Sequence, residues 1–315
     1  MKNKFAVILC FVITLPLFFT SCQKEQEGVF NPKKKIERIY YEYHEYDYDG
    51  DYQYDENKQL KEVWEWDGDL LSSITYCDSE YGNETYIFSY DGKRLSQVRS
   101  SDGRYRFDYE YENGLITCIQ TFQNGEAWET IRFTHTGNKI SRIEETHTVG
   151  DKGRNCSISP LRFVLSDMDL RHTLVDAHNI SAKCSEQYRG EYRTVYELEW
   201  EKDNVKKIKS VFYWNGNQDF SFWEYTYDTK MNPFYNSFQP ILMLGDIPDF
   251  LCFAIPKNNV VTVKVSGQDQ EYVYDNTYSY EGAYPIVEER NLTSWINEGV
   301  LQNCLVREVF YYEYK

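Results

Sequence analysis

The sequence predicts an all-β fold, an antiparallel β-meander that is curled or barrel-like. From Ile36 onward, aromatic and polar residues alternate with a period of two, which is typical of half-exposed strands. Asp-Gly and Asn-Gly steps recur between these runs and favour tight hairpin turns. No stretch of this repeated part shows a convincing helical period. We therefore expect one β-meander domain over residues 36–315.

The composition narrows the class of protein further. The chain has 315 residues, with 34 Lys and Arg against 50 Asp and Glu, and a formal net charge of -16. Hydrophobic residues make up 41% of it, and Tyr alone occurs 29 times. This is apolar enough to form a core, so the composition excludes wholesale disorder. The acidic balance argues against a nucleic-acid partner, whose binders carry a basic surface.

The N-terminus has the features of a secretory signal. Lys2 and Lys4 precede the apolar stretch Phe5–Phe19, which is too short and too closely followed by polar residues for a spanning helix. The stretch ends in Phe19-Thr20-Ser21-Cys22, which resembles a bacterial lipobox. That resemblance implies cleavage after residue 21, lipidation of Cys22 and anchoring in the outer membrane, since two or three acyl chains anchor stably. The alternative is an ordinary signal peptide with a chance cysteine.

The residues after Cys22 predict where the protein is displayed. Gln23–Glu27 looks like the export signal of surface lipoproteins in Bacteroides-type bacteria, so we favour the cell surface over the periplasm. The alternative is a plain charged tether, because linkers near a lipid anchor are usually polar. Residues 22–35 carry no apolar period and are expected to be a flexible tether.

A hairpin pattern recurs along the domain. Two aromatic or apolar residues spaced by one precede a turn rich in Asp, Asn and Gly, and an apolar pair spaced by three follows; the clearest copy runs from Phe88 through Asp91-Gly92 to Val98. We expect Tyr90, Tyr111 and Phe133 on a buried or half-buried face. The other copies are Tyr52/Tyr54 to Leu60/Val63, Trp64/Trp66 to Leu71/Ile74, Tyr109/Tyr111 to Ile116/Ile119, Ile131/Phe133 to Ile140/Ile143, Leu198/Trp200 to Val205/Ile208, and Tyr225/Tyr227 without the apolar pair.

This pattern resembles the YD repeat of bacterial surface proteins. The whole chain resembles an uncharacterised Bacteroides-type lipoprotein family whose domain is described as porin-like. Beyond the repeat and the lipobox, the resemblance rests on Asn232-Pro233-Phe234, Lys257–Val261, Tyr278–Pro285 and the closing strand Glu308–Tyr314. It implies a porin-like β-meander over most of residues 36–315. The family has no established activity, so the resemblance implies no catalytic residue.

Two stretches break the pattern. Residues 144–190 are polar and irregular and are expected to leave the sheet as a long excursion. Residues 234–256 contain the apolar groups Ile241–Leu244 and Phe250–Phe253, which would suit a short helix over a sheet end or edge. No Gly-, Ser- or Pro-rich linker divides the chain, so a single domain is expected.

The cysteines give no unique disulfide pattern. Six cysteines allow 15 pairings in an exported protein, and a bridge between Cys156 and Cys184 would close the excursion. The alternative is that most are small apolar residues, which we favour for Cys77 and Cys118 because they lie in repeat strands. The six are Cys77, Cys118, Cys156, Cys184, Cys252 and Cys304.

No motif identifies a catalytic or metal centre. Only His172, Asp176 and His178 are close together in sequence, and their spacing matches no known zinc motif. Asp47–Asp51 is better explained as a hairpin turn than as a calcium loop. Carboxylates are too abundant for an acid/base pair to be chosen, so we predict no catalytic residue, no cofactor and no metal ligand. The five histidines are His44, His135, His147, His172 and His178.

Rows of Tyr and Trp could stack on sugar rings, but we favour a structural role, because Tyr suits a half-buried sheet. A membrane-spanning barrel is disfavoured, since both faces of Tyr40–Tyr48 carry acids. We therefore predict a non-enzymatic binding or scaffold lipoprotein of the cell envelope, with a glycan or a protein as partner. The alternative is a glycoside hydrolase that uses a carboxylate pair in the concavity of the sheet.

Overall fold

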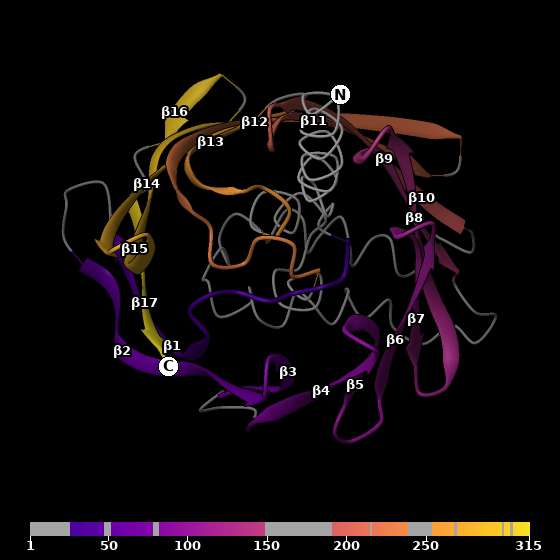
Figure 1. Ribbon diagram of the computed structural model, residues 1–315. Helices are drawn as coiled ribbons and strands as arrows, with labels where there is room; N and C mark the ends of the chain where they lie inside the picture. The colour runs from indigo at the N-terminus through magenta and orange to yellow at the C-terminus, as the bar shows by residue number, and fades with distance from the viewer. Residues whose placement is uncertain are drawn as a thin grey trace, which may run out of the picture.

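A computed structural model describes residues 26–46, 52–77, 82–148, 191–214, 216–238, 254–267, 270–297, 299–302 and 305–315. In these residues 17 strands form one antiparallel sheet, in which the first strand also pairs with the last. The sheet is therefore closed into a barrel, seen end-on as a ring in Figure 1. The prediction of an all-β, antiparallel, barrel-like fold is confirmed.

The strands follow one another around the barrel in chain order. β16 pairs with the end of β15, and β17 pairs with the earlier part of β15, so the ring itself has sixteen strands. The strands are β1 (Ile36–Tyr46), β2 (Tyr52–Asp67), β3 (Leu70–Tyr76), β4 (Glu84–Asp91), β5 (Arg94–Ser100), β6 (Tyr105–Glu112), β7 (Leu115–Gln123), β8 (Glu126–Thr136), β9 (Lys139–Thr148), β10 (Glu191–Glu201), β11 (Asn204–Trp214), β12 (Asn217–Met231), β13 (Asn258–Ser266), β14 (Gln270–Glu281), β15 (Tyr284–Asn297), β16 (Val300–Gln302) and β17 (Leu305–Tyr314).

The two ends of the barrel differ. Because neighbouring strands are antiparallel, the connections that follow β2, β4, β6, β8, β10, β12 and β14 all lie at one end, which we call the turn end. The glycines of its tight turns have positive φ, such as 63° at Gly92 and 86° at Gly114, as the sequence predicts. The connections after the odd-numbered strands lie at the opposite end, which we call the far end.

A β-bulge in the hairpins of the turn end explains the apolar pair spaced by three. Strand residues three apart normally face opposite sides, but between Ser89 and Tyr90 the register shifts, which leaves Ser96 as an extra residue. Leu95 and Val98, on either side of Ser96, are therefore both buried. The Ser96 hydroxyl donates to the Ser89 carbonyl oxygen (3.0 Å). The same hydroxyl-to-carbonyl bond recurs at the bulges of Ser72, Thr117 and Ser141.

The aromatic residues of the hairpins face the barrel interior. Tyr90 and Tyr111 are half-buried and Phe133 is buried, as predicted. The Tyr90 hydroxyl donates to the Leu71 carbonyl oxygen of the preceding hairpin (2.8 Å), and Trp200 Nε1 donates to the Ile140 carbonyl oxygen in the same way (2.7 Å). These aromatic side chains thus connect consecutive hairpins, which supports the structural role that we favoured for them.

Two expectations about local structure were wrong. The expected hairpin between Tyr54 and Leu60 is absent, because β2 runs as one strand from Tyr52 to Asp67. This segment has no glycine to adopt the positive φ that the other turns use. The expected excursion also begins later than residue 144, because β9 continues to Thr148. Of the polar residues in this last part of β9, Glu145 and His147 face the interior and belong to the site described below.

Two chain segments fill the interior at the turn end, and we call them together the plug. They are residues 26–35, before β1, and residues 232–238 with 254–257, between β12 and β13. Both run inside the ring in Figure 1, the first in indigo and the second in orange. Phe30 and Phe238 are 3% and 2% exposed and belong to the main core. The Asn236 amide joins the segments by donating to the carbonyl oxygens of Gln26 and Val29 (3.0 and 3.1 Å).

The plug is also bonded to the barrel wall. The Leu95 amide donates to the Gly28 carbonyl oxygen (2.9 Å), and the Ile116 amide donates to Glu27 Oε2 (2.7 Å). The same carboxylate lies 3.1 Å from His135 Nε2. A flexible tether was expected over residues 22–35. From residue 26 onward, the segment packs a buried phenylalanine into the barrel and makes these bonds to its wall.

Several expectations lie outside the described residues. They concern the signal peptide at 1–21, Cys22 with the start of the tether, the turn at 47–51, and the greater parts of the excursion and of the expected short helix, at 149–190 and 239–253. Cys156, Cys184, Cys252 and Cys304 lie there too, whereas Cys77 and Cys118 are half-buried and form no disulfide. Among the described residues, none form a helix of the length and hydropathy needed to cross a membrane.

Candidate functional site

Inward-facing polar residues gather on β8 and β9 toward the far end. On β8, the alternation that places Ile131 inside also places Glu129 inside. On β9, Ile143 is followed at intervals of two by Glu145 and His147, which therefore share its face. Glu129 and His147 are direct partners in the β8–β9 register. Strand periodicity alone therefore brings these three side chains together.

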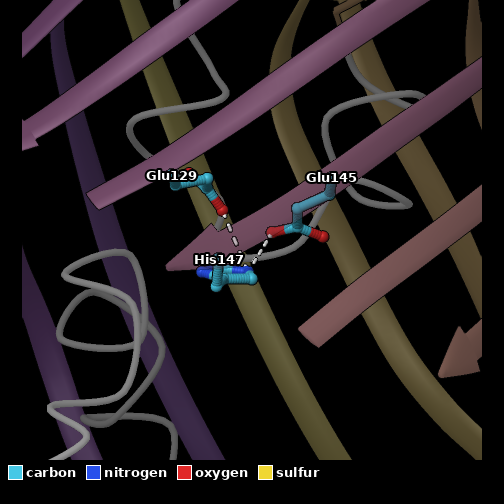
Figure 2. Close-up of side chains that lie close together, drawn as sticks. All are labelled: Glu129, Glu145 and His147. Atoms are coloured by element: carbon cyan, nitrogen blue, oxygen red, sulfur yellow. Dashed lines mark hydrogen bonds and ion pairs between the residues drawn. The ribbon is translucent and has the colours of Figure 1, made fainter. Parts of the chain in front are cut away.

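The three side chains converge on one nitrogen atom, as Figure 2 shows. His147 Nε2 lies 3.1 Å from Glu129 Oε1 and 2.9 Å from Glu145 Oε1. The side chains of Glu129, Glu145 and His147 are 6%, 15% and 23% exposed. One ligand-type atom from each residue lies within 4.8 Å of the others. We call this group the β8–β9 cluster.

Neighbouring side chains hold the cluster in position. The Thr121 hydroxyl donates to Glu129 Oε2 (3.3 Å), and the Tyr196 hydroxyl donates to Glu145 Oε2 (3.0 Å). Burial acts to raise the pKa of Glu145, but hydrogen bonds with Glu129, His147 and Tyr196 outweigh burial and lower it to about 2. Glu145 is therefore a carboxylate at neutral pH.

A second cluster of buried charges lies across the ring, on β15 and β17. Arg290 Nε donates to Glu288 Oε1 (2.7 Å), and Arg290 is the register partner of Glu308. Tyr312 donates to Glu288 Oε2 (2.5 Å) and Tyr41 donates to Glu308 Oε1 (2.9 Å). Both carboxylates are 3% exposed. We call this group the β15–β17 cluster, and Figure 1 places its strands on the opposite side of the ring from β8 and β9.

Arginine determines the charge of the β15–β17 cluster. Burial acts against the charged form of Arg290, but Glu288 and Tyr312 outweigh burial and raise its pKa above the usual value. Burial raises the pKa of Glu308, although Arg290 and Tyr41 oppose that shift. A guanidinium remains protonated in proteins, so this cluster contains its own permanent cation.

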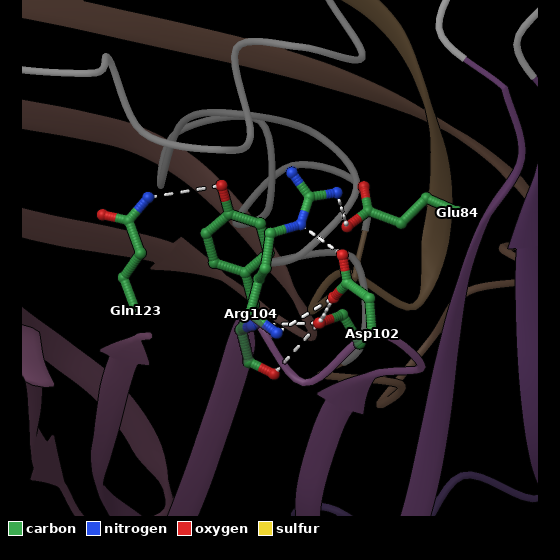
Figure 3. Close-up of polar contacts among 6 residues, drawn as sticks. Glu84, Asp102, Arg104 and Gln123 are labelled. Atoms are coloured by element: carbon green, nitrogen blue, oxygen red, sulfur yellow. Dashed lines mark hydrogen bonds and ion pairs between the residues drawn. The ribbon is translucent and has the colours of Figure 1, made fainter. Parts of the chain in front are cut away.

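A third polar group lies at the far end, at the connection between β5 and β6 (Figure 3). Arg104 pairs with Asp102 and lies 3.8 Å from Glu84 Oε1, while Gln123 donates to the Tyr105 hydroxyl (3.3 Å). The Arg104 and Asp102 side chains are 57% and 42% exposed. Exposed pairs contribute little free energy, so this group orders a connection and shows no feature of a site.

The outer face of the wall carries charged pairs. Lys207 on β11 and Glu224 on β12 are register partners with an Nζ–Oε1 distance of 2.9 Å. They face outward because the adjacent residues Ile208 and Tyr225 are buried inside. Comparable outward pairs are Arg142–Glu144, Lys264–Glu271, Arg307–Glu289 and Arg38–Glu313.

The outer face also exposes aromatic side chains on β11 and β12. Tyr213 and Phe220 are 36% and 44% exposed, and the Phe220 and Phe222 rings pack edge to face with centroids 5.8 Å apart. Arg193 lies over the Tyr213 ring at 5.0 Å and Lys207 lies over the Phe222 ring at 5.3 Å. We call Tyr213, Phe220 and Phe222 the outer aromatic patch.

The residues of the β8–β9 cluster differ from the site residues that the sequence analysis considered. Cys22, His172, Asp176 and His178 lie outside the described residues. Sequence reasoning did not select Glu129 or Glu145, and it counted His147 only as one scattered histidine. The signal that could have found them is the strand period: continued past Ile143, it puts residues 145 and 147 on the inner face.

Comparison with known proteins supports the fold. No protein-family profile matches the chain, and no curated protein matches it. A porin-like protein from Bacteroides uniformis superimposes with a TM-score of 0.51 and 10% sequence identity, over 92% of this chain and 100% of that chain. A porin-like protein from Bacteroides vulgatus gives a TM-score of 0.28 at 10% identity, over 89% of this chain and 99% of that chain. The likeness to the Bacteroides uniformis protein supports the closed antiparallel barrel, and it concerns the fold alone.

Proposed function

We propose that the protein is a lipid-anchored barrel of the bacterial outer membrane, displayed at the cell surface, that binds a glycan and catalyses no reaction. The lipobox at Cys22 supports the anchor, and the porin-like fold is compatible with an envelope location. The barrel would stand in water beside the membrane, and its outer wall would supply the binding surface.

The observation that carries this proposal is the charged outer wall. A barrel that spans a membrane presents an apolar band to lipid, and a charged side chain at the middle of that band costs about 2–4 kcal/mol. Here outward ion pairs occur on β9, on β11 and β12, and on β15 and β17, which are spread around the ring. Such a wall is suited to water. The plug, with Phe30 and Phe238 packed in the interior, further supports a binding role over conduction.

The outer aromatic patch supports a glycan as the ligand. Phe220 and Tyr213 are exposed on a water-facing sheet, and the hydrogen-bond donors Arg193 and Lys207 lie over the Tyr213 and Phe222 rings of the same patch. An apolar face next to fixed donors suits a sugar ring, which has C–H faces and hydroxyl edges. By contrast, the repeated tyrosines such as Tyr90 face inward and bond to the neighbouring hairpin, so they offer no such platform.

A glycoside hydrolase is the second candidate, and the β8–β9 cluster is the observation that bears on it. Hydrolases of this kind place two carboxyl groups on either side of the scissile bond. Glu129 and Glu145 are close enough, but both contact His147 Nε2, so the imidazole occupies the space that a sugar would need. This geometry favours binding over hydrolysis.

Two experiments test the proposal. Metabolic labelling with an alkyne fatty acid should mark the wild type and miss Cys22→Ser, and equal labelling of both would refute the anchor. A glycan array should retain the whole protein, and Phe220→Ser should weaken that retention at least tenfold. Ile87→Ser, an outward apolar residue on β4, should change nothing. If the wild type bound only another protein and no glycan, the proposal of a glycan ligand would be refuted. If the wild type hydrolysed a glycan and Glu145→Gln did not, the second candidate would be favoured.

A further inference from the structure

The β8–β9 cluster has the donor types of a transition-metal site. His147 supplies an imidazole nitrogen, and Glu129 and Glu145 each supply one carboxylate oxygen directed at it (Figure 2). Zinc in proteins is bound by such nitrogen and oxygen donors, whereas calcium and magnesium prefer oxygen donors alone. The donor set therefore selects an ion of the zinc type.

The distances between donors are close to those around a bound ion. Zinc lies about 2.0–2.1 Å from nitrogen and oxygen ligands, so two donors of a tetrahedral site are about 3.3–3.4 Å apart. The nitrogen–oxygen distances here are 3.1 Å to Glu129 and 2.9 Å to Glu145. An ion at the centre would require these donors to separate by only a few tenths of an ångström, which side-chain torsions can supply.

The donors are also supported from behind. Thr121 and Tyr196 donate to the remaining oxygens of Glu129 and Glu145, which directs the opposite oxygens at His147. Trp128 packs edge to face on the His147 ring, with centroids 6.3 Å apart and planes at 80°. Such partners orient metal ligands in known sites and commonly change metal affinity by 10–100-fold.

Charge also favours a cation. Two glutamates directed at one imidazole nitrogen in a largely buried position offer negative charge that a divalent ion would balance. The β15–β17 cluster meets the same need with Arg290, whose guanidinium contacts Glu288. In the β8–β9 cluster the shared partner is an imidazole, which becomes a metal ligand in its neutral form.

We infer that Glu129, Glu145 and His147 bind one zinc-type divalent cation in the barrel wall, with its remaining coordination position open to water or to a ligand. This inference is independent of the proposed glycan binding, because the outer aromatic patch faces the opposite side of the wall.

Zinc titration of the whole chain tests it. Protein stripped with a chelator should take up one zinc per chain, measured by calorimetry and by elemental analysis after gel filtration. Glu145→Gln and His147→Asn should each weaken binding at least tenfold. Magnesium and calcium, in excess, should fail to displace the zinc.

Two matched controls keep the result interpretable. Glu144→Gln alters the neighbouring carboxylate on the outer face, and His135→Asn alters the half-buried histidine that pairs with Glu27 at the turn end. Both should bind zinc like the wild type. If the cluster variants fold poorly, cobalt substitution in the wild type decides, because a nitrogen–oxygen site of low coordination gives intense visible absorption. Folded wild-type protein that takes up no zinc, or controls that lose it as cluster variants do, would overturn the inference.

Discussion

The β8–β9 and β15–β17 clusters both bury two glutamates, but they surround different nitrogen groups. Each turns two glutamates toward the barrel interior, where tyrosine hydroxyls donate to them. Tyr196 donates to Glu145 in one cluster, and Tyr312 and Tyr41 donate to Glu288 and Glu308 in the other. In the β15–β17 cluster the carboxylates surround Arg290. In the β8–β9 cluster both glutamates contact the Nε2 atom of one imidazole, a group that can also ligate a metal ion. The β15–β17 cluster thus contains a cation supplied by its own chain, whereas the β8–β9 cluster is the one that we propose to take a cation from outside.

The largest effect should come from removing the internal cation. Arg290→Met would leave Glu288 and Glu308 buried without their counterion, at a cost of about 3–5 kcal/mol in the free energy of unfolding. Arg307→Met, which breaks an outward pair with Glu289, should cost less than about 1 kcal/mol. Urea unfolding of both variants measures the difference. Equal losses would show that the β15–β17 cluster does not depend on its arginine.

Glu62 is a further inward carboxyl group, and its partner is an indole in place of a cation. Trp64 Nε1 donates to Glu62 Oε2 (2.7 Å), but burial dominates and raises the pKa of Glu62 to about 7. The ordinary pKa of this group is 4.5, so between pH 4.5 and about 7 the folded chain keeps a proton that the unfolded chain has lost. The free energy of unfolding therefore falls as the pH rises through this range. Between pH 5 and pH 8 the wild type should lose about 2 kcal/mol more than Glu62→Gln does. Parallel stability curves for the two proteins would contradict this.

Removing a tyrosine hydroxyl should cost more stability in the cluster whose charges are more deeply buried. Tyr312→Phe removes a hydrogen bond of 2.5 Å between buried groups and should cost about 2 kcal/mol, because bonds to charged groups are strong. Tyr196→Phe removes one of 3.0 Å to the partly exposed Glu145 and should cost about 1 kcal/mol. Thermal melting without added metal provides the measurement. The reverse order would mean that the β8–β9 cluster is the more tightly coupled of the two.

The smallest loss of stability should come from a hydrogen bond in an ordinary hairpin, and it serves as the reference for the charged clusters. Ser96→Ala removes the bulge hydroxyl that donates to the Ser89 carbonyl oxygen and should cost about 0.5–1 kcal/mol. Ser89→Ala leaves that carbonyl unchanged and should be neutral within about 0.5 kcal/mol. If Ser96→Ala lowered the free energy of unfolding as much as Tyr312→Phe, the buried charged clusters would contribute no more to stability than an ordinary bulge.

Much of the wall could be predicted from sequence because its rules are local. Period-two alternation identified the inward face of Tyr90 and Phe133, and Asp91-Gly92 identified a turn. The bulges and the plug were not predicted. An apolar pair spaced by three does not by itself reveal the extra residue between its members. Phe30 lies in the plug and Trp64 on β2, so their packing joins two segments that are distant in sequence.

The β8–β9 cluster was missed for a different physical reason. Periodicity methods recognise an inner face by its apolar residues, and this inner face changes from apolar to polar between Ile143 and Glu145. The polar end of β9 therefore resembled the start of a loop. Its geometry also depends on Glu129, which lies opposite His147 only once the β8–β9 register is set. Sites built from ordinary charged residues on regular strands lack the spacing that makes a zinc motif recognisable.

The pairing of β1 with β17 has a consequence for the order of folding. Ile36 and Tyr314 are register partners, although almost the entire domain separates them along the chain. Each hairpin can form as soon as its two strands exist, but this seam can close only after the last strand has emerged. Until then both edge strands present unpaired backbone groups. The yield of closed barrels should therefore depend on how long the β1 edge stays unpaired before β17 is available.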